Sequence, residues 1–411
     1  MTQRLLWRRS PHPGNPGVSS RGLLAVVAAC AGPDLVPEVK KYLMWYGQRV
    51  PQCTALVAML SCIEHPLAEQ LLLSVANRID WDAPRVAQAL ARRRGRSMAD
   101  LVDRTVPTAG FDENGQLQLS YGSRVFTATL TPGLTVELRN PDGKTITSLP
   151  PPRGSDDKQQ AEAAKQRLAA VKKELELIAG HQTARLYDAM CTGRKWAVSD
   201  WRTYLAEHPV MRHLVRRLVW IATWQPDRAV SFRPLEDGSL TDVDDNEVTV
   251  PEDGTISLAH DVWLSADEAA AWLRHFADYE VAPLFPQLGK KAFRLAPQQR
   301  HALVIKDFEG RRVVASTLHE RAKMLGYFRA WRSEDGDTFY HYRKRFPRGI
   351  TAVIRFSGSS LVSETNRIVD LEELVFVDAE RERPVPLGTV PAVVLSEAWN
   401  DMRLIAETAT T

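Results

Sequence analysis

Cysteine is scarce in this sequence, and its few positions form no metal-binding pattern. Of the 411 residues only four are cysteines, at positions 30, 53, 62 and 191, and no two stand at a CxxC or other zinc-ligand spacing. Neither a zinc module nor a disulfide framework is therefore indicated. We expect reduced thiols in a cytoplasmic protein, with Cys53 and Cys62 buried in apolar helices.

The sequence also lacks an apolar run long enough to span a membrane. The longest run, residues 22–32, is too short to cross a bilayer. Residues 27–30, which follow a basic leader, imitate a lipoprotein signal. The leader, however, is rich in proline and glycine, and the run continues into helical sequence. We therefore expect a packed helix here and no membrane partner.

Neither a dominant charge nor a familiar catalytic motif is present. The formal net charge is only +3, so no overall basic field favours nucleic acid. We find no GxxxxGK[ST], GxGxxG, HExxH or GxSxG motif, and the ten histidines suggest no triad. No cofactor is expected and no enzyme class is indicated, although catalysis stays an open alternative.

What the sequence does contain is the patterning of a multidomain α+β protein. With 44% hydrophobic and 25% charged residues, its composition is that of an ordinary globular chain. Apolar spacing changes from helical to alternating near residue 107 and returns to helical near residue 155. The predicted divisions are a disordered lead-in (1–19), the end of an α-helical, HEAT-like repeat region (20–106), a small antiparallel β meander (107–150), a central helical or α+β domain (151–290) and a C-terminal α+β domain (291–411).

Shorter patterns place individual elements. Long helices are expected to start at Ser155 or Asp156 and at Ser265, because these residue types favour helix N-termini, and Gly193 is expected to end the first. Thr317 with Glu320 predicts a capping box. Further helices are predicted at 199–207, 297–309, 316 onward and 396–407, and strands at 117–121, 125–130, 134–138, 145–149, 229–233, 327–331, 338–346, 350–356 and 371–377.

Residues 210–224 are the most unusual stretch. Plotted as a helix, they have one apolar face and one face of cations and aromatics. Pairs one turn apart, such as Arg212 with Arg216, could grip an oxyanion, and Trp220 could stack on a base. The alternative is a helix packed between two layers, with arginines paired to nearby acids and tryptophans in the core. The candidate anion-binding residues are Arg212, His213, Arg216, Arg217, Trp220 and Arg233.

An acidic loop between residues 241 and 253 is the candidate metal site. Asp242, Asp244 and Asp245 could share a divalent ion, since carboxylate oxygens are the ligands such ions prefer. The loop is not an EF-hand, because Glu247 replaces the required glycine. A solvated turn, or an ion-pair partner for arginines, is the alternative explanation.

A second basic and aromatic run covers residues 340–346 and is followed by Arg348. On a strand, His341, Arg343 and Arg345 would share one face. A half-buried strand with a charged outer face explains this pattern. A winged helix whose wing contacts phosphate is the sharper alternative.

Several short sequence segments, taken together, resemble those of a known family. They are His208-Pro209 with residues 217–220, residues 232–238 continuing into 242–245, residues 278–280, residues 285–288, and residues 390–391 with 396–397. The chain resembles a bacterial domain-of-unknown-function family called molybdate metabolism regulator-like, whose members often carry a WGR domain and HEAT-like repeats. It looks like an N-terminally shortened member, and it contains no Trp-Gly-Arg tripeptide.

These observations favour a non-enzymatic regulatory or interaction module with protein partners. A solenoid-like start commonly presents a binding surface, and no catalytic signature accompanies it. Two alternatives stay open. One is nucleic-acid or oxyanion binding through residues 210–224, and the other is a divalent-metal-dependent enzyme that uses residues 242–247.

Overall fold

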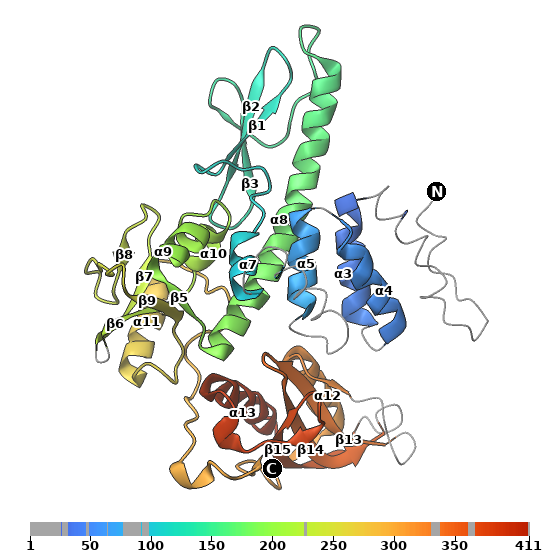
Figure 1. Cartoon of the computed structure of the whole chain (residues 1–411), viewed down its shortest axis with the longest axis vertical. Helices are drawn as coiled ribbons and strands as arrows, with labels where there is room; N and C mark the ends of the chain where they lie inside the picture. Colours follow the sequence, from blue (N-terminus) through green and yellow to red (C-terminus); the bar gives the residue numbers. More distant parts are fainter. Residues whose placement is uncertain are drawn as a thin grey trace, which may run out of the picture. The chain divides into compact units, whose positions relative to one another are not determined.

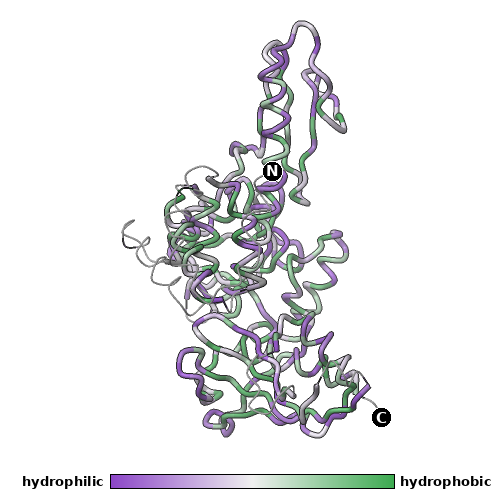
Figure 2. The backbone as a smooth tube through the Cα atoms, turned by 90° about the vertical axis from the view of Figure 1, so that its right-hand side faces the viewer, coloured by the Kyte–Doolittle hydropathy of each residue, from purple (hydrophilic) through white to green (hydrophobic). Residues whose placement is uncertain are grey.

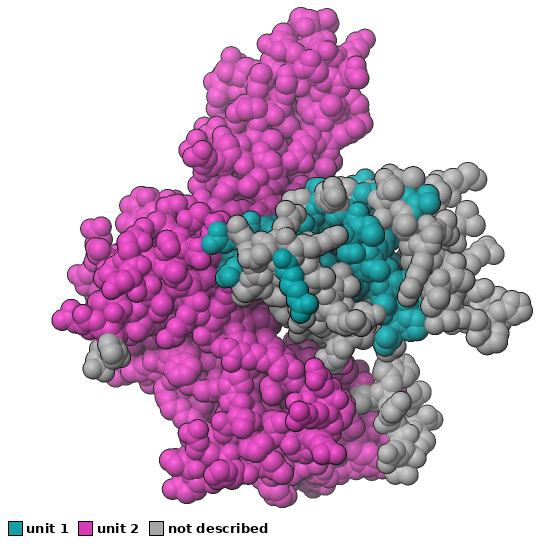
Figure 3. All heavy atoms as spheres, viewed as in Figure 1, with its two compact units in different colours: residues 1–105 teal, residues 106–411 magenta. Residues whose placement is uncertain are grey.

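The computed structural model describes most of the chain in two compact units. The described residues are 26, 32–46, 49–63, 65–76, 92, 98–225, 228–329, 338–360 and 366–409. Unit 1 is Met1–Thr105 and unit 2 is Val106–Thr411, coloured separately in Figure 3. The predicted lead-in, residues 1–19, lies outside the described residues. No helix among these residues is both long and apolar enough to cross a membrane.

Unit 1 is helical where it is described. Its elements are η1 (Gly32–Leu35), α3 (Val36–Trp45), α4 (Val50–Leu60), α5 (Pro66–Ala76) and α7 (Met98–Arg104). Prolines stand in the first turn of α3 and α4, where the missing N–H costs nothing. Leu56, Leu60, Leu71 and Leu72 are buried, as their helical spacing predicts. Cys53 is buried as expected, but Cys62 is exposed because it lies in the turn after α4.

Unit 2 begins with the predicted meander. Strands β1 (Gln116–Ser120), β2 (Val125–Leu130), β3 (Val136–Arg139) and β4 (Thr145–Ile146) pair in that order, and all pairs are antiparallel. One face of this sheet packs on the start of helix α8 (Lys158–Thr192) through Leu119, Phe126, Leu138, Ala164 and Leu168. Figure 2 shows both hydrophilic and hydrophobic residues in this part of the chain, at the top of the view.

Helix α8 (Lys158–Thr192) is 35 residues long and runs through unit 2 (Figure 1). Its predicted stripe, which includes Val171, Leu175 and Ile178, is buried. Gly193 ends it in the left-handed conformation, φ 60°. The N-cap is Asp157 rather than Ser155 or Asp156, because Asp156 is engaged in an ion pair with Arg124. Besides the meander, α8 contacts the central sheet and the last helix.

The central sheet has the order β5-β9-β6-β7-β8. Its strands are β5 (Lys195–Ala197), β6 (Trp220–Gln225), β7 (Arg228–Pro234), β8 (Leu240–Thr241) and β9 (Thr255–Leu258). Helices α9 (Val198–Trp201), η2 (Arg202–Ala206), α10 (Met211–Val215) and α11 (Ala266–Asp278) accompany it. The predicted strand at 229–233 and the helix after Ser265 are confirmed, and Ser265 caps α11 by accepting a hydrogen bond from Glu268 N.

The predicted helix at residues 210–224 is wrong beyond Val215. Helix α10 covers only Met211–Val215, and Trp220 begins strand β6. Residues 220–223 pair with β7 on one side and β9 on the other, and the indole of Trp220 donates to Val215 O at 3.0 Å. The β-branched and aromatic residues here fit a central strand, so pairing overrides the helical spacing.

The C-terminal part is built on a seven-stranded sheet, with path β10-β15-β14-β13-β12 and β11 and β16 also paired to β15. Its strands are β10 (Val304–Ile305), β11 (Arg312–Val314), β12 (Phe328–Arg329), β13 (Phe339–Phe346), β14 (Ile350–Ser359), β15 (Ile368–Asp378) and β16 (Arg383–Pro384). Helices α12 (Ala315–Met324) and α13 (Ala392–Ala406) and the short turns η3 (Pro297–Gln299) and η4 (Leu387–Thr389) complete it. The mixed α+β class with antiparallel sheets is therefore confirmed.

Three C-terminal predictions are wrong. Residues 297–309 form only the turn η3 and strand β10, because the backbone of Val304 and Ile305 pairs with β15. The helix–helix–hairpin order of a winged helix is therefore not formed. The Thr317–Glu320 capping box is also not formed, since α12 starts at Ala315 without a side-chain cap.

Candidate functional site

The predicted arginines lie in unit 2, but they do not converge. Arg212 Nη1 donates to Glu113 O at 2.7 Å, Arg216 Nη2 to Glu236 O at 2.9 Å, and Arg217 Nε to Ala282 O at 2.8 Å. Arg212 lies in α10, and Arg216 and Arg217 directly follow it. Each of these arginines therefore connects this part of the chain to the backbone of a different loop. Acidic side chains, the partners expected from the sequence, do not receive these bonds.

Trp220 and His213 are buried rather than presented to a ligand. Trp220 packs edge-on against Trp196 and Trp201, with centroids 5.7 and 5.5 Å away, so it belongs to the core. Neither ring nitrogen of His213 has a hydrogen-bond partner in the described part of the chain. Burial, with Arg212 and Arg216 close by, lowers the pKa of His213 to about 4. His213 is therefore neutral at pH 7.

Arg233 and the acidic loop do meet, through helix α11. Arg233 Nε donates to His275 Nε2 at 3.3 Å, and His275 Nδ1 lies 3.6 Å from Asp245 Oδ1. Tyr279 donates its hydroxyl to the same Asp245 oxygen at 2.9 Å. This bond raises the pKa of Tyr279, and burial and Arg233 lower that of His275. Because Arg233 occupies the free lone pair of His275, this cluster is not arranged as a general base.

The other acids of the loop shape a turn. Asp242 Oδ1 accepts the backbone N–H groups of Asp244 and Asn246, both at 2.9 Å, which is an Asx turn. Asp245 has φ 64°, a conformation that aspartate tolerates better than most residues. Among the described residues no group of three or more histidine, cysteine or acidic side chains is placed to hold a metal ion.

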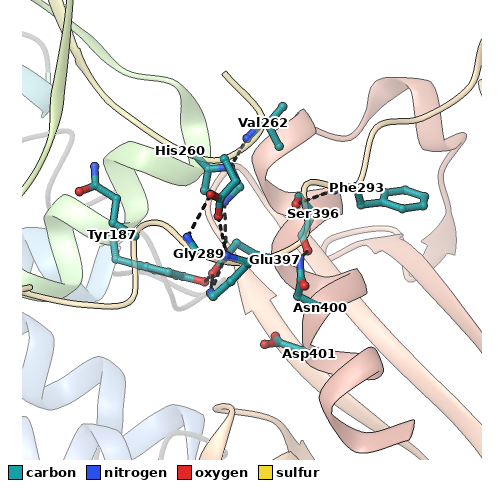
Figure 4. A network of polar contacts seen from close by, with 12 residues as sticks. Tyr187, His260, Val262, Gly289, Phe293, Ser396, Glu397, Asn400 and Asp401 are labelled. Carbon is teal, nitrogen blue, oxygen red and sulfur yellow. Dashed lines mark hydrogen bonds and ion pairs between the residues drawn. The ribbon is translucent and has the colours of Figure 1, made fainter. Parts of the chain in front are cut away.

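A buried polar network that the sequence did not predict centres on Glu397 of α13, which is 1% exposed. Its carboxylate accepts from Tyr187 at 2.7 Å, from Lys290 Nζ at 2.7 and 2.8 Å, and from His260 Nε2 at 3.3 Å. Figure 4 shows Tyr187 and His260 beside Glu397. Burial raises the pKa of Glu397, but the bonds from His260 and Lys290 outweigh burial and lower it to about 2.

The same network fixes the strap formed by residues 287–294. Asp261 accepts from the backbone of Gly289 and Lys290 at 3.0 and 2.9 Å, and Ser396 accepts from Phe293 N at 3.1 Å (Figure 4). These contacts join residues that are far apart in the sequence, so they could not be predicted from local residue spacing. The network is internally satisfied, and its evident effect is to hold α13 against α8 and the central sheet.

Unit 2 contains an open groove beside α8 with a volume of about 590 Å³. It is bounded by residues 133–136 before and at the start of β3, by the middle of α8, by Leu214 and Arg217 at and after the end of α10, and by Leu284. Its walls combine apolar side chains with two cations and one acid. The lining residues are Gly133, Leu134, Thr135, Val136, Lys172, Leu175, Glu176, Ala179, Thr183, Leu214, Arg217 and Leu284. Of the predicted anion-binding residues, only Arg217 lines it.

A second, smaller pocket of about 290 Å³ adjoins the central sheet. Arg216, another predicted residue, lines this pocket rather than the groove. The charged lining residues are Arg202, Glu207, Arg216 and Glu247, and the others include Val198, Trp201, Ala206, Leu235, Leu240, Val250 and Ile256. Of the four predicted arginines, Arg216 and Arg217 therefore line separate cavities, and Arg212 and Arg233 line neither of the two.

Comparison with known proteins identifies relatives but no activity. A family model described as a domain of unknown function (DUF4132) matches residues 143–327. The chain is 28% identical over 263 residues to the uncharacterized protein YehI of Escherichia coli (strain K12), an alignment that covers 63% of this chain and 21% of that protein. The aligned region thus corresponds to about a fifth of that relative's length. No solved structure matches. Neither name mentions molybdate, a WGR domain or HEAT-like repeats, so these remain predictions.

Proposed function

We propose that the chain is a non-enzymatic interaction module that binds a segment of a partner protein in the groove beside α8. The groove is the observation that carries this proposal. Its volume of about 590 Å³ is within the usual range for binding sites, and an apolar lining with few polar groups is typical of them. Four separate segments of unit 2 build it, and most of its residues lie in the region that matches the domain family.

The lining suggests the chemistry of the partner segment. Leu134, Leu175 and Leu214, with Val136 and Leu284, supply apolar surface for aliphatic or aromatic side chains. Lys172 and Arg217 contribute two positive charges against the single negative charge of Glu176. We therefore expect a short segment with apolar side chains and at least one carboxylate.

One groove residue adopts a costly backbone conformation. Leu134 has φ 57°, a region that leucine rarely occupies, and such residues concentrate at ligand-binding sites. The turn that holds it is closed by Thr131 and Thr135, whose hydroxyls lie 2.8 Å apart. The strained turn places Leu134 in the groove wall, which supports a binding role for that wall.

The two alternatives from the sequence have less support. Nucleic-acid or oxyanion binding by a continuous surface of Arg212, Arg216 and Arg217 would need their guanidinium groups together, whereas each donates to a different loop. Metal-dependent catalysis by Asp242 and Asp245 would compete with the Asx turn and the Tyr279 hydrogen bond. The regulatory role implied by the family resemblance fits an interaction module, and we retain it as part of the proposal.

Peptide selection with matched tryptophan variants tests the proposal. Peptides from a random phage-displayed library would be selected on the full chain, and their affinities measured by fluorescence polarisation. Ala179→Trp fills the groove, because Ala179 lines it. Ala169→Trp makes the same change at an exposed position of α8 outside the groove lining and is the control.

We expect the selected peptides to combine apolar and acidic residues. Ala179→Trp should lower the affinity for these peptides at least about tenfold, which corresponds to about 1.4 kcal/mol. Ala169→Trp should leave their affinity unchanged. Lys172→Glu should also weaken binding. A library that yields no binder, or peptides that bind Ala179→Trp as tightly as the native chain, would refute the proposal.

A further inference from the structure

The pocket of about 290 Å³ beside the central sheet, here called the Trp201 pocket, has features of a separate small-molecule site. Its walls come from α9 and η2, from Arg216 after α10, from the β7–β8 hairpin, and from residues 247–250 with Ile256. All of these lie in unit 2 and in the region that matches the domain family. The groove beside α8 shares no lining residue with it.

The first feature is an unused hydrogen-bond donor. Trp201 lines the pocket and is 2% exposed, yet its buried indole N–H has no acceptor in the described part of the chain. By contrast, the indoles of Trp220, Trp272 and Trp399 donate to Val215 O, Ser231 Oγ and Asp307 Oδ2. A buried donor without a partner is costly, and an acceptor on a bound molecule would satisfy it.

The second feature is a cation in the lining of the same pocket. Arg216 is partly buried and lines the same pocket. Burial, and then the charge of Arg212, disfavours its protonated form and lowers its pKa, so a bound anion would stabilise it. Arg216 donates from Nη2 to Glu236 O, which fixes the guanidinium at the pocket wall. A carboxylate is the small anion whose two oxygens suit one guanidinium and one additional N–H donor.

The third feature is a pair of carboxylates at the exposed edge of the pocket. Glu207 and Glu247 line it and are both exposed. Within the described residues neither side chain makes an ion pair or a hydrogen bond. Arg202, the other cation of the lining, is exposed and pairs with Glu252. The partly buried Arg216 is therefore the lining cation that we assign to a bound carboxylate, and Glu207 and Glu247 are acceptors at the solvent side. The remaining wall is largely apolar, with Val198, Leu240 and Ile256 among its residues.

The backbone supports this assignment. Residues Arg202–Ala206, which include two lining residues, form a π-helical turn. Such turns are rare and frequently occur at functional sites. The turn follows Trp201 directly, so the unusual backbone and the unpaired indole belong to the same wall.

We propose that the Trp201 pocket binds a free α-amino acid with an apolar side chain. The ligand carboxylate accepts from the Trp201 indole N–H and from Arg216, and its ammonium group faces Glu207 and Glu247. The aliphatic side chain lies against Val198, Leu240 and Ile256. This site is independent of the groove beside α8, so either proposal can fail without the other.

Isothermal titration calorimetry of the full chain with the twenty common amino acids tests the assignment. We expect leucine, isoleucine or valine to bind, and aspartate and lysine to bind much more weakly. Leucinamide lacks the carboxylate and 4-methylpentanoate lacks the ammonium group, so each should lose at least about tenfold in affinity against leucine. Inorganic phosphate is the comparison for a simple anion site.

Three variants connect the binding to the named groups. Trp201→Phe keeps an aromatic but smaller ring and removes the N–H, Arg216→Gln removes the charge, and Glu247→Gln removes one carboxylate. Each substitution should lower the affinity for leucine about tenfold or more. Trp263→Phe changes a 55% exposed tryptophan outside the pocket and should leave the affinity for leucine unchanged. Far-UV circular dichroism checks that each variant is folded. Ala179→Trp should leave leucine affinity unchanged.

The proposal is overturned if no amino acid binds at millimolar concentration. It is also overturned if leucinamide or phosphate binds as tightly as leucine, or if folded Arg216→Gln and Glu247→Gln both bind leucine normally.

Discussion

At the scale of single residues, the main finding is how the cationic side chains of residues 212–217 are used. A guanidinium carries several N–H donors in a fixed plane, and backbone carbonyls in loops have no ladder partner. Arg212, Arg216 and Arg217 each meet one such carbonyl in another segment. Their charge therefore contributes to loop placement first, and only Arg216 and Arg217 also line a cavity.

Because His213 is buried in its neutral form, we expect the free energy of unfolding to decrease at acidic pH. Its folded pKa of about 4 lies below the ordinary 6.5, so the unfolded chain binds the proton more readily. Its contribution to stability is complete above pH 6.5 and is lost as the pH falls toward 4. Between pH 7 and pH 5 this loss is on the order of 1–2 kcal/mol. His213→Leu should remove that part of the loss, as measured by urea unfolding at both pH values.

The same substitution at exposed His301 serves as the control and should leave the pH dependence of unfolding unchanged. An equal loss of stability from pH 7 to pH 5 in the native chain and His213→Leu would contradict the burial of a neutral imidazole at position 213.

At the scale of elements, helix caps show which local signals the fold uses. Ser265 accepts from Glu268 N and starts α11, as its sequence context predicts. Thr317 has an equally suitable sequence context, but α12 starts at Ala315 and includes Thr317 in its first turn. The difference arises because β11 leads directly into α12, so strand pairing sets the point at which that helix begins.

These two positions give a matched prediction. Ser265→Ala should lower the free energy of unfolding by about 1 kcal/mol, whereas Thr317→Ala should change it by less than about 0.5 kcal/mol. Ser265→Asn preserves an acceptor and should be nearly neutral. Denaturant unfolding of the three variants decides the matter, and equal destabilisation by the two alanine substitutions would count against the assigned caps.

At the scale of the whole of unit 2, the Glu397 network holds α8, the strap and α13 together. Tyr187, His260 and Lys290 all donate to one buried carboxylate. Removing one partner of a buried ion pair leaves an uncompensated charge. The consequence should be global, because these groups come from segments that are distant in sequence.

Glu397→Ala should therefore lower the free energy of unfolding by about 3–5 kcal/mol, and Glu397→Gln by less, since the amide still accepts. Glu407→Ala, which breaks the partly exposed pair with Arg403 on the same helix, should cost no more than about 0.5 kcal/mol. A small effect of Glu397→Ala would show that the network does not hold the segments together.

The ionised Glu397 side chain should also make the stability depend on pH. Its folded pKa is about 2 against the ordinary 4.5, so its contribution to the free energy of unfolding should be complete above pH 4.5 and should be lost as the pH falls through 2. Unfolding curves from pH 7 to pH 3 measure this loss.

The sequence by itself determined the elements whose signals are local. The meander, the apolar stripe and Gly193 end of α8, the Ser265 cap, and strands β13 to β15 follow from residue periodicity and turn chemistry, which act over a few neighbouring residues. Only the tertiary structure decided that residues 220–225 form a strand, because the pairing partners lie in β7 and β9. It also decided the Glu397 network, the groove and the Trp201 pocket, since each assembles side chains from segments that no sequence spacing relates.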